Sequence, residues 1–200
     1  GWSGITWPAQ YGGKGASAIQ AAIFAEEQAH FDVATGAFAI SIGMVGPTLI
    51  AHGTPEQQQR WLPSILDGSA EWTQLFSEPD AGSDLASLRT QAVPDGDEYV
   101  INGQKIWSTW ANHSQWGILL ARTDPDAPKH RGISYFVLDM ATPGIEIRPI
   151  TEMTGGNHFN EVFFDDVRIP ASLRVGEEGD GWRLAKVTLS NERVSLSAAG

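Results

Sequence analysis

One short segment concentrates groups that suit contact with a flat or anionic ligand. Residues 74–90 read QLFSEPDAGSDLASLRT, and the Ala81-Gly82-Ser83 stretch offers main-chain N–H groups with little side-chain cover. Ser77 and Ser83 add hydroxyl groups. The ordinary alternative is a turn that closes a strand, with Ser and Asp side chains bonded to their own backbone. Taken alone, the segment fits a ligand-binding loop and a plain turn equally well.

A second segment supplies an aromatic face. Residues 105–109 read KIWST. Side chains alternate along a strand, so Trp107 and Thr109 are expected to point the same way, with Ser108 between them. A broad indole face beside a hydroxyl group suits a planar heterocycle. The alternatives are a core aromatic for Trp107 and a cross-strand pair for Thr109.

The two segments in this order resemble the acyl-CoA dehydrogenase family of flavoenzymes. The resemblance rests on FSEP at residues 76–79, on AGSD at residues 81–84, and on KIWST at residues 105–109. It extends over nearly the whole chain, because the Trp-Pro and Tyr-Gly-Gly elements within residues 7–13 are similar to the N-terminal domain of the family. Two motifs in the right order are more specific than either one alone.

The resemblance implies a bound FAD and a set of residues that contact it. Trp107 would cover the flavin ring, and Thr109 would hydrogen-bond near the ring atom that accepts the hydride. Ser83 would lie near the pyrophosphate or the acyl thioester. The residues that the resemblance assigns to the cofactor are Phe76, Ser77, Gly82, Ser83, Trp107, Ser108 and Thr109.

The implied reaction is α,β-desaturation of an acyl-CoA thioester, in which a carboxylate removes the α proton and the β hydrogen leaves as a hydride. Glu192 is the candidate base, because Asn191-Glu192-Arg193 follows an apolar helical run and resembles the base position of the isovaleryl and long-chain branches. Other branches place the base on a later helix. A helix-surface or interdomain ion pair is the ordinary alternative for Glu192. Arg193 and Ser83 are the candidate substrate contacts.

Other activities fit the same scaffold. A flavin oxidase or monooxygenase would let reduced flavin react with oxygen, and a non-catalytic acyl-CoA-binding or interaction paralogue would keep the fold without the chemistry. Rapid reoxidation by oxygen with peroxide release separates an oxidase from a dehydrogenase. The resemblance also implies an electron acceptor such as electron-transfer flavoprotein, and a homo-oligomer that is either a dimer or a tetramer.

Composition argues against several other kinds of site. The 200 residues contain no Cys, which excludes disulfides, thiolate nucleophiles and Cys-ligated metals. The formal net charge of −11 argues against a nucleic-acid-binding surface, and the five His residues lack metal-ligand spacing. Gly and Pro break the apolar run at residues 33–51, which favours a buried helix over a membrane span. No signal peptide is visible, so we expect a cytoplasmic protein, or one of the mitochondrial matrix if the source is eukaryotic.

Residues 1–70 are expected to form an α-helical domain. Ser17 can cap a helix that runs to about Phe31, and the apolar run is expected to form a second helix that breaks before Pro47. Thr54 followed by Pro-Glu-Gln is a strong helix start, and Gly68 supplies the stop.

From residue 71 the pattern changes to short apolar runs bounded by Gly, Pro, Asn and Asp, which indicates a barrel-like β domain over residues 71–175. The expected strands are residues 72–76, 98–101, 105–109, 116–122, 133–139, 145–149 and 161–167. Hairpin turns are expected at residues 94–97 and at Asn102-Gly103. Helical periodicity returns over residues 181–197, so residues 176–200 are expected to begin a C-terminal helical bundle, which makes the chain α+β.

Overall fold

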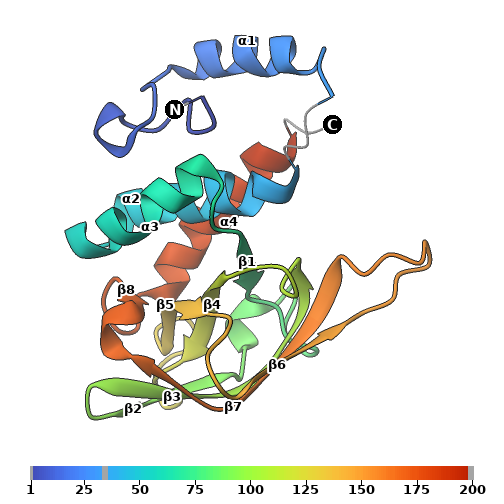
Figure 1. Ribbon diagram of the computed structural model, residues 1–200. Helices are drawn as coiled ribbons and strands as arrows, with labels where there is room; N and C mark the ends of the chain where they lie inside the picture. The colour runs from blue at the N-terminus through green and yellow to red at the C-terminus, as the bar shows by residue number, and fades with distance from the viewer. Residues whose placement is uncertain (1, 33–35, 198–200) are drawn as a thin grey trace. The chain divides into compact units, whose positions relative to one another are not determined.

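The computed structural model describes residues 2–32 and 36–197, with side chains throughout these ranges except at Ala37 and residues 193–197. The chain forms two compact units, which Figure 1 shows as a mainly helical part and a sheet. One unit holds Gly1–Glu71 with Thr188–Gly200, and the other holds Trp72–Val187. The predicted α+β class is confirmed. The predicted domain division at residues 1–70, 71–175 and 176–200 stays a prediction.

Two helices of the first unit begin where the sequence predicts. The Ser17 hydroxyl accepts a hydrogen bond from Gln20 N, and the Gln20 side chain accepts one from Ser17 N, so that this capping box starts α1 (Ala18–Gln28). Thr54 and Gln57 make the same reciprocal pair at the start of α3 (Pro55–Asp67). Gly68 ends α3 in the left-handed conformation.

The predicted break before Pro47 is wrong. A π-helical segment, η3 (Ser41–Val45), leads directly into α2 (Gly46–His52), and Pro47 lies in the first turn of α2. Pro47 has no N–H group to donate, and it lies where the hydrogen-bond pattern changes from π-helical to α-helical, so the helix continues through it. The predicted start of this helix includes residues 33–35, which lie outside the described residues.

Large side chains fill the core of the first unit. Trp7, Val45, Leu49 and Trp61 are each at most 3% exposed. A Cβ atom at Gly46 would lie 2.0 Å from a ring carbon of Trp7, so this helix position has room only for glycine. The unit also contains two short 3₁₀ turns, η1 (Ala9–Tyr11) and η2 (Gly36–Phe38).

The second unit is one curved sheet of eight strands. The strands are β1 (Trp72–Leu75), β2 (Gln91–Asp95), β3 (Glu98–Thr109), β4 (Trp116–Arg122), β5 (Ile133–Asp139), β6 (Ile145–Pro149), β7 (Phe159–Pro170) and β8 (Arg174–Val175). They follow the order β6-β7-β3-β2-β4-β5-β8, and β1 pairs in parallel with β4. The two ends of this order, β6 and β8, are edge strands, so the sheet is open and the predicted barrel is not closed.

The predicted hairpin at Asn102-Gly103 is wrong, because β3 continues through it. The side chain of Asn102 turns to β7 instead, where it donates to Asp166 Oδ1 and accepts from Asp166 N, each over 2.9 Å. A register shift against β7 between Ile101 and Gly103 accommodates the glycine at φ 149°. The predicted turn between β2 and β3 is confirmed, with Gly96 at φ 67°. Strands β2 and β8 were not predicted.

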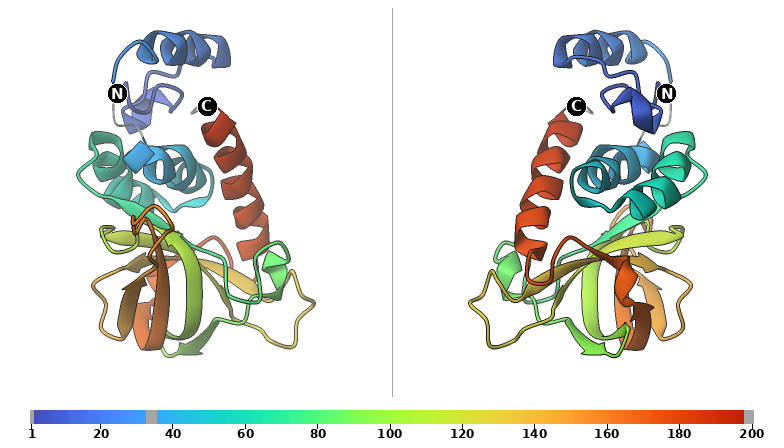
Figure 2. Two further views of the ribbon diagram at one scale, coloured as in Figure 1. Left: turned by 90° about the vertical axis from the view of Figure 1, so that its right-hand side faces the viewer. Right: turned by 90° about the vertical axis from the view of Figure 1, so that its left-hand side faces the viewer.

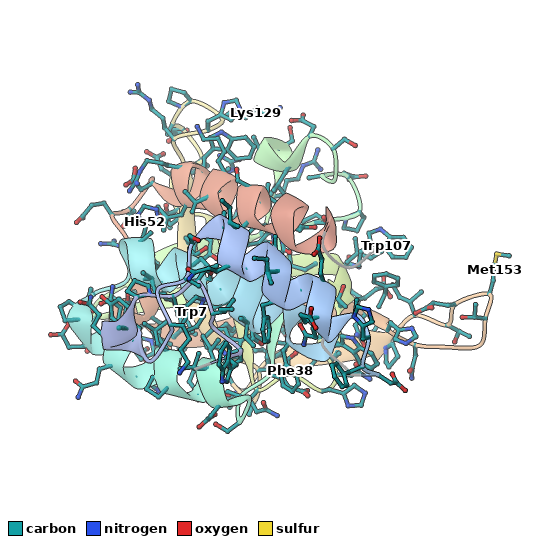
Figure 3. All side chains as sticks on the ribbon, turned by 90° about the horizontal axis from the view of Figure 1, so that it is seen from above. Trp7, Phe38, His52, Trp107, Lys129 and Met153 are labelled. Carbon is teal, nitrogen blue, oxygen red and sulfur yellow. The ribbon has the colours of Figure 1, made fainter. Side chains whose placement is uncertain are left out.

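Three further observations complete the description of the fold. The last helix, α4 (Gly181–Ser197), begins where predicted, and the β4–β5 loop lies beside its first turn, where the rings of His130 and Trp182 are 4.8 Å apart (Figure 2). The β6–β7 connection extends from the sheet as an arm with the fully exposed Met153 at its tip (Figure 3). Among the described residues, no helix combines the length and the apolar character that crossing a membrane requires.

Candidate functional site

The two predicted ligand segments lie against each other in the second unit. The backbone N–H of Ile106 donates a hydrogen bond to the carbonyl oxygen of Ser77 over 2.9 Å. One residue earlier, the Lys105 ammonium group donates to the carbonyl oxygen of Phe76 over 3.0 Å. The fold therefore joins residues 76–78 and 105–107 directly.

A buried ion pair that was not predicted holds this junction. The Lys105 side chain is fully buried, and its Nζ lies 2.9 Å from Glu78 Oε1. The Glu78 carboxylate also accepts hydrogen bonds from the backbone N–H groups of Arg89 (2.6 Å) and Thr90 (2.9 Å). The available signal was a lysine in an otherwise apolar strand position, since a buried ammonium group requires a partner.

The electrostatics of the pair have opposing causes. Burial lowers the pKa of the Lys105 ammonium group to about 8, although the Glu78 carboxylate favours its charged form. Burial favours the neutral form of Glu78, but the charge of Lys105 and the hydrogen bonds that the carboxylate accepts outweigh burial and lower the pKa of Glu78. Both groups are therefore charged at neutral pH.

The loop after Glu78 presents exposed backbone. Glu78 and Ala81 exchange two backbone hydrogen bonds of 3.0 Å, which close a tight turn. Gly82 and Ser83 follow it on the surface, and a Cβ atom at Gly82 would meet nothing within 4 Å. In the described part of the chain, neither residue donates a backbone hydrogen bond, so both N–H groups are available to a ligand.

Trp107 lies in a β-bulge, so the predicted alternation does not apply to it. The pairing of β3 with β7 shifts register between Lys105 and Ser108, and Trp107 adopts φ 61°. Its indole is 57% exposed, which rules out the alternative of a core aromatic. The ring meets Phe159 edge to face, with centroids 6.0 Å apart, and Figure 3 shows it projecting beyond the ribbon.

The remaining predicted contacts differ in exposure. Phe76 is buried as a whole residue, with its ring edge to face against Tyr135 and its carbonyl oxygen bonded to Lys105. Ser108 is fully buried, whereas Ser77 and Thr109 are half-buried. The hydroxyl groups of Ser77 and Thr109 form no hydrogen bond within the described residues.

Asn160 on β7 supports the bulge and was not predicted. Its buried amide nitrogen donates to the Ser108 carbonyl oxygen over 3.1 Å and to Asn112 Oδ1 over 3.3 Å. Within the described residues, Ser108 Oγ and Asn160 Oδ1 are buried polar atoms without a hydrogen-bond partner. Hydrogen bonds to backbone and amide groups therefore hold the bulge, and the Trp107 ring is exposed at the surface.

The structure does not test the two predicted residues of α4. Glu192 is half-buried and belongs to the first unit, while the two segments belong to the second. The side chain of Arg193 lies outside the described residues. Among the described residues, no cluster of three or more His, Asp or Glu side chains is placed to hold a metal ion.

The arrangement fits a flat, polar cofactor with an anionic part. The exposed Trp107 residue offers a stacking face, and the hydroxyl groups of Ser77 and Thr109 have no hydrogen-bond partner within the described residues. The exposed N–H groups of Gly82 and Ser83 suit a phosphate or carbonyl oxygen. This donor set matches FAD in kind.

Comparison with known proteins agrees with this chemistry. The family models described as "Acyl-CoA dehydrogenase, N-terminal domain" and "Acyl-CoA dehydrogenase, middle domain" match residues 1–69 and 73–167. The acyl-CoA dehydrogenase FadE34 of Mycobacterium tuberculosis is 52% identical over 191 residues, which cover 96% of this chain and 27% of FadE34.

Solved structures give the same result. The "Tcur3481-Tcur3483 steroid ACAD" superposes with a TM-score of 0.90 at 40% identity, over 99% of this chain and 51% of that chain. The ChsE4-ChsE5 complex from Mycobacterium tuberculosis superposes with a TM-score of 0.85 at 41% identity, over 96% of this chain and 49% of that chain. The chain thus spans about half the length of these solved relatives. Because the two family models match in order and together cover most of the chain, the chain belongs to the acyl-CoA dehydrogenase family.

Proposed function

We propose that the full-length protein catalyses FAD-dependent α,β-desaturation of an acyl-CoA thioester, and that this chain supplies one face of the flavin site. The observation that carries the proposal is the hydrogen bond from Ile106 N to Ser77 O. It holds Ser77, which precedes the loop of Gly82 and Ser83, beside the residue next to the exposed Trp107, and this supports a site in which a stacking face and a polar edge act together.

Each proposed cofactor contact follows from exposure and chemistry. Trp107 stacks on the ring system, and the Ser77 and Thr109 hydroxyl groups bond to its polar edge. Phe76 supports the site from beneath, because the residue is buried and its carbonyl oxygen accepts the hydrogen bond from Lys105. Gly82 and Ser83 donate backbone N–H groups to the pyrophosphate or to the thioester. When bound, the flavin supplies the acceptor for the hydride that leaves the β carbon.

The substrate and its activation are further parts of the proposal. Glu192 is the candidate base for the α proton, with Arg193 and Ser83 as candidate substrate contacts. The relative described as a steroid ACAD supports an acyl group that carries a ring system, so CoA thioesters with steroid side chains are assayed beside straight-chain ones. In the Glu192→Gln variant, substrate should no longer bleach the flavin, while FAD stays bound; bleaching at the wild-type rate assigns the base elsewhere.

Partners complete the proposal. We propose that electron-transfer flavoprotein or another acceptor reoxidises the reduced enzyme, and that the protein assembles as a homodimer or homotetramer in the cytoplasm. The relative solved as a ChsE4-ChsE5 complex makes a mixed assembly the competing result. Mass measurement of the purified protein distinguishes one kind of subunit from two.

One experiment tests the activity. The full-length protein is mixed with acyl-CoA without oxygen, and flavin absorbance is followed before and after oxygen is admitted. Bleaching by substrate with slow reoxidation supports a dehydrogenase. Rapid reoxidation with peroxide identifies an oxidase or monooxygenase, and a colourless protein that takes up no FAD identifies a non-catalytic paralogue.

A further inference from the structure

We propose that Lys105 and Glu78 are positioning residues of the flavin site, and that the two ligand segments keep their mutual geometry only while both side chains carry their charges. The proposal rests on the proposed FAD site. It concerns two residues that contact no substrate in our assignment and act through the backbone of their neighbours.

The ion pair is connected to both ligand segments. Lys105 Nζ bonds to the Phe76 carbonyl oxygen and to Glu78 Oε1, which lie on either side of Ser77. Ser77 itself accepts the hydrogen bond from Ile106, the residue between Lys105 and Trp107. One ammonium group thus fixes the backbone that carries a hydroxyl contact and the strand that carries the aromatic face.

Glu78 closes the loop at both ends. The residue lies at the start of the loop, and its carboxylate accepts the backbone N–H groups of Arg89 and Thr90, 11 and 12 residues later. Gly82 and Ser83 lie between these ends. The three hydrogen bonds that the Glu78 carboxylate accepts fix its position, so the carboxylate holds both ends of the loop in place.

A buried ion pair contributes little to stability compared with apolar packing. Removing two charges from water is costly, and well-packed apolar residues of similar volume often stabilise a fold as well as a buried ion pair does. General stability is therefore a weak reason for a fully buried lysine at position 105. Fixing one specific backbone arrangement is a better reason, because an apolar side chain cannot donate to the Phe76 carbonyl oxygen.

The test compares Lys105→Met, Glu78→Gln and the double variant in the full-length protein. FAD affinity, the visible circular dichroism of the bound flavin, and the melting temperature are measured for each. Arg148→Met with Glu146→Gln is the matched control. These two residues form an ion pair on β6 of the same sheet, with Arg148 Nε 2.8 Å from Glu146 Oε1, but both side chains are more than half exposed. Loss of one charge-assisted hydrogen bond should raise the FAD dissociation constant on the order of tenfold, while the control should stay within about twofold.

The double variant separates positioning from stability. It removes both charges together, so its melting temperature should recover relative to the single variants. Its FAD affinity and flavin spectrum should stay altered, because the Phe76 carbonyl oxygen still lacks its donor. Recovery of affinity together with melting temperature would show a merely structural role, as would single variants that bind FAD like the wild type. A wild-type protein that binds no FAD overturns the proposed function itself, and this inference with it.

Discussion

The buried amide of Asn160 donates a hydrogen bond to the backbone carbonyl of Ser108 over 3.1 Å, at the point where β3 departs from regular pairing with β7. The same nitrogen reaches Asn112 Oδ1 in the turn after β3. Trp107 and Trp110 adopt φ 61° and 56° on either side of this contact. Left-handed backbone costs about 1–2 kcal/mol for an ordinary residue, so the amide offsets part of the cost of presenting Trp107.

Replacing Asn160 should therefore loosen the bulge. In Asn160→Ala the buried Ser108 carbonyl oxygen loses the hydrogen bond from the Asn160 side-chain amide, which should lower the free energy of unfolding by about 1–3 kcal/mol. Urea unfolding measures the change. Asn157→Ala, in the exposed loop before β7, is the matched control and should stay within about 0.5 kcal/mol of the wild type. Equal stability of the two variants would show that the amide does not hold the bulge.

Comparing glycine with alanine at position 107 separates the cost of backbone strain from the loss of ligand contact. Because Trp107 has φ 61° and a largely exposed ring, Trp107→Gly should be more stable than Trp107→Ala by about 1 kcal/mol. Both variants should retain FAD more weakly than the wild type, since neither has a stacking face. If alanine proves the more stable replacement, the bulge relaxes once the indole is gone.

Local chemistry explains what the sequence predicted well. The capping residues Thr54 and Gln57 and the glycine at position 68 act within a few residues of the helix ends, so the bounds of α3 could be read directly. The short apolar run of β5, which Gly132 precedes and Asp139 ends, likewise gave both ends of the strand. The two ligand segments were found because their order matches a family pattern.

Long-range pairing explains what the sequence did not predict. Asn102-Gly103 has the composition of a hairpin turn, but Asn102 bonds to Asp166, 64 residues away. The partner of Lys105 is Glu78, 27 residues earlier, and nothing local identifies it. The bulge at Trp107 is likewise decided by the register of β7. Such contacts depend on the assembled sheet.

The backbone of Gly103 lies so close to Thr90 that a side chain at position 103 should destabilise the protein. A Cβ atom there would lie 2.6 Å from Thr90 Oγ1 and 2.7 Å from Thr90 Cα, and the residue has φ 149°. Gly103→Ala should therefore destabilise the protein by about 1–3 kcal/mol, as overpacked positions do. Gly82→Ala, whose Cβ atom would meet nothing within 4 Å, should change stability by less than about 0.5 kcal/mol. Thermal unfolding of the two variants gives the comparison.

The Glu78 carboxylate should make the free energy of unfolding depend on pH in the acidic range. Its folded-state pKa lies below its ordinary value of 4.5, so the unfolded chain takes up the proton first as the pH falls. The stabilisation is present above pH 4.5 and is lost as the pH falls through the folded-state pKa. In Glu78→Gln this part of the acid dependence should disappear. The variant should also lose about 3–5 kcal/mol at neutral pH, because the buried Lys105 charge is left unpaired.

Urea unfolding of both proteins from neutral pH down to about pH 3 measures the difference in slope. Glu146→Gln is the control, since Glu146 forms an exposed pair with Arg148 and such pairs contribute little to stability. Its acid profile should follow that of the wild type. Parallel profiles for Glu78→Gln and the wild type would mean that the carboxylate has the same proton affinity in the folded and unfolded chains, which its three hydrogen bonds and the ammonium group 2.9 Å away argue against.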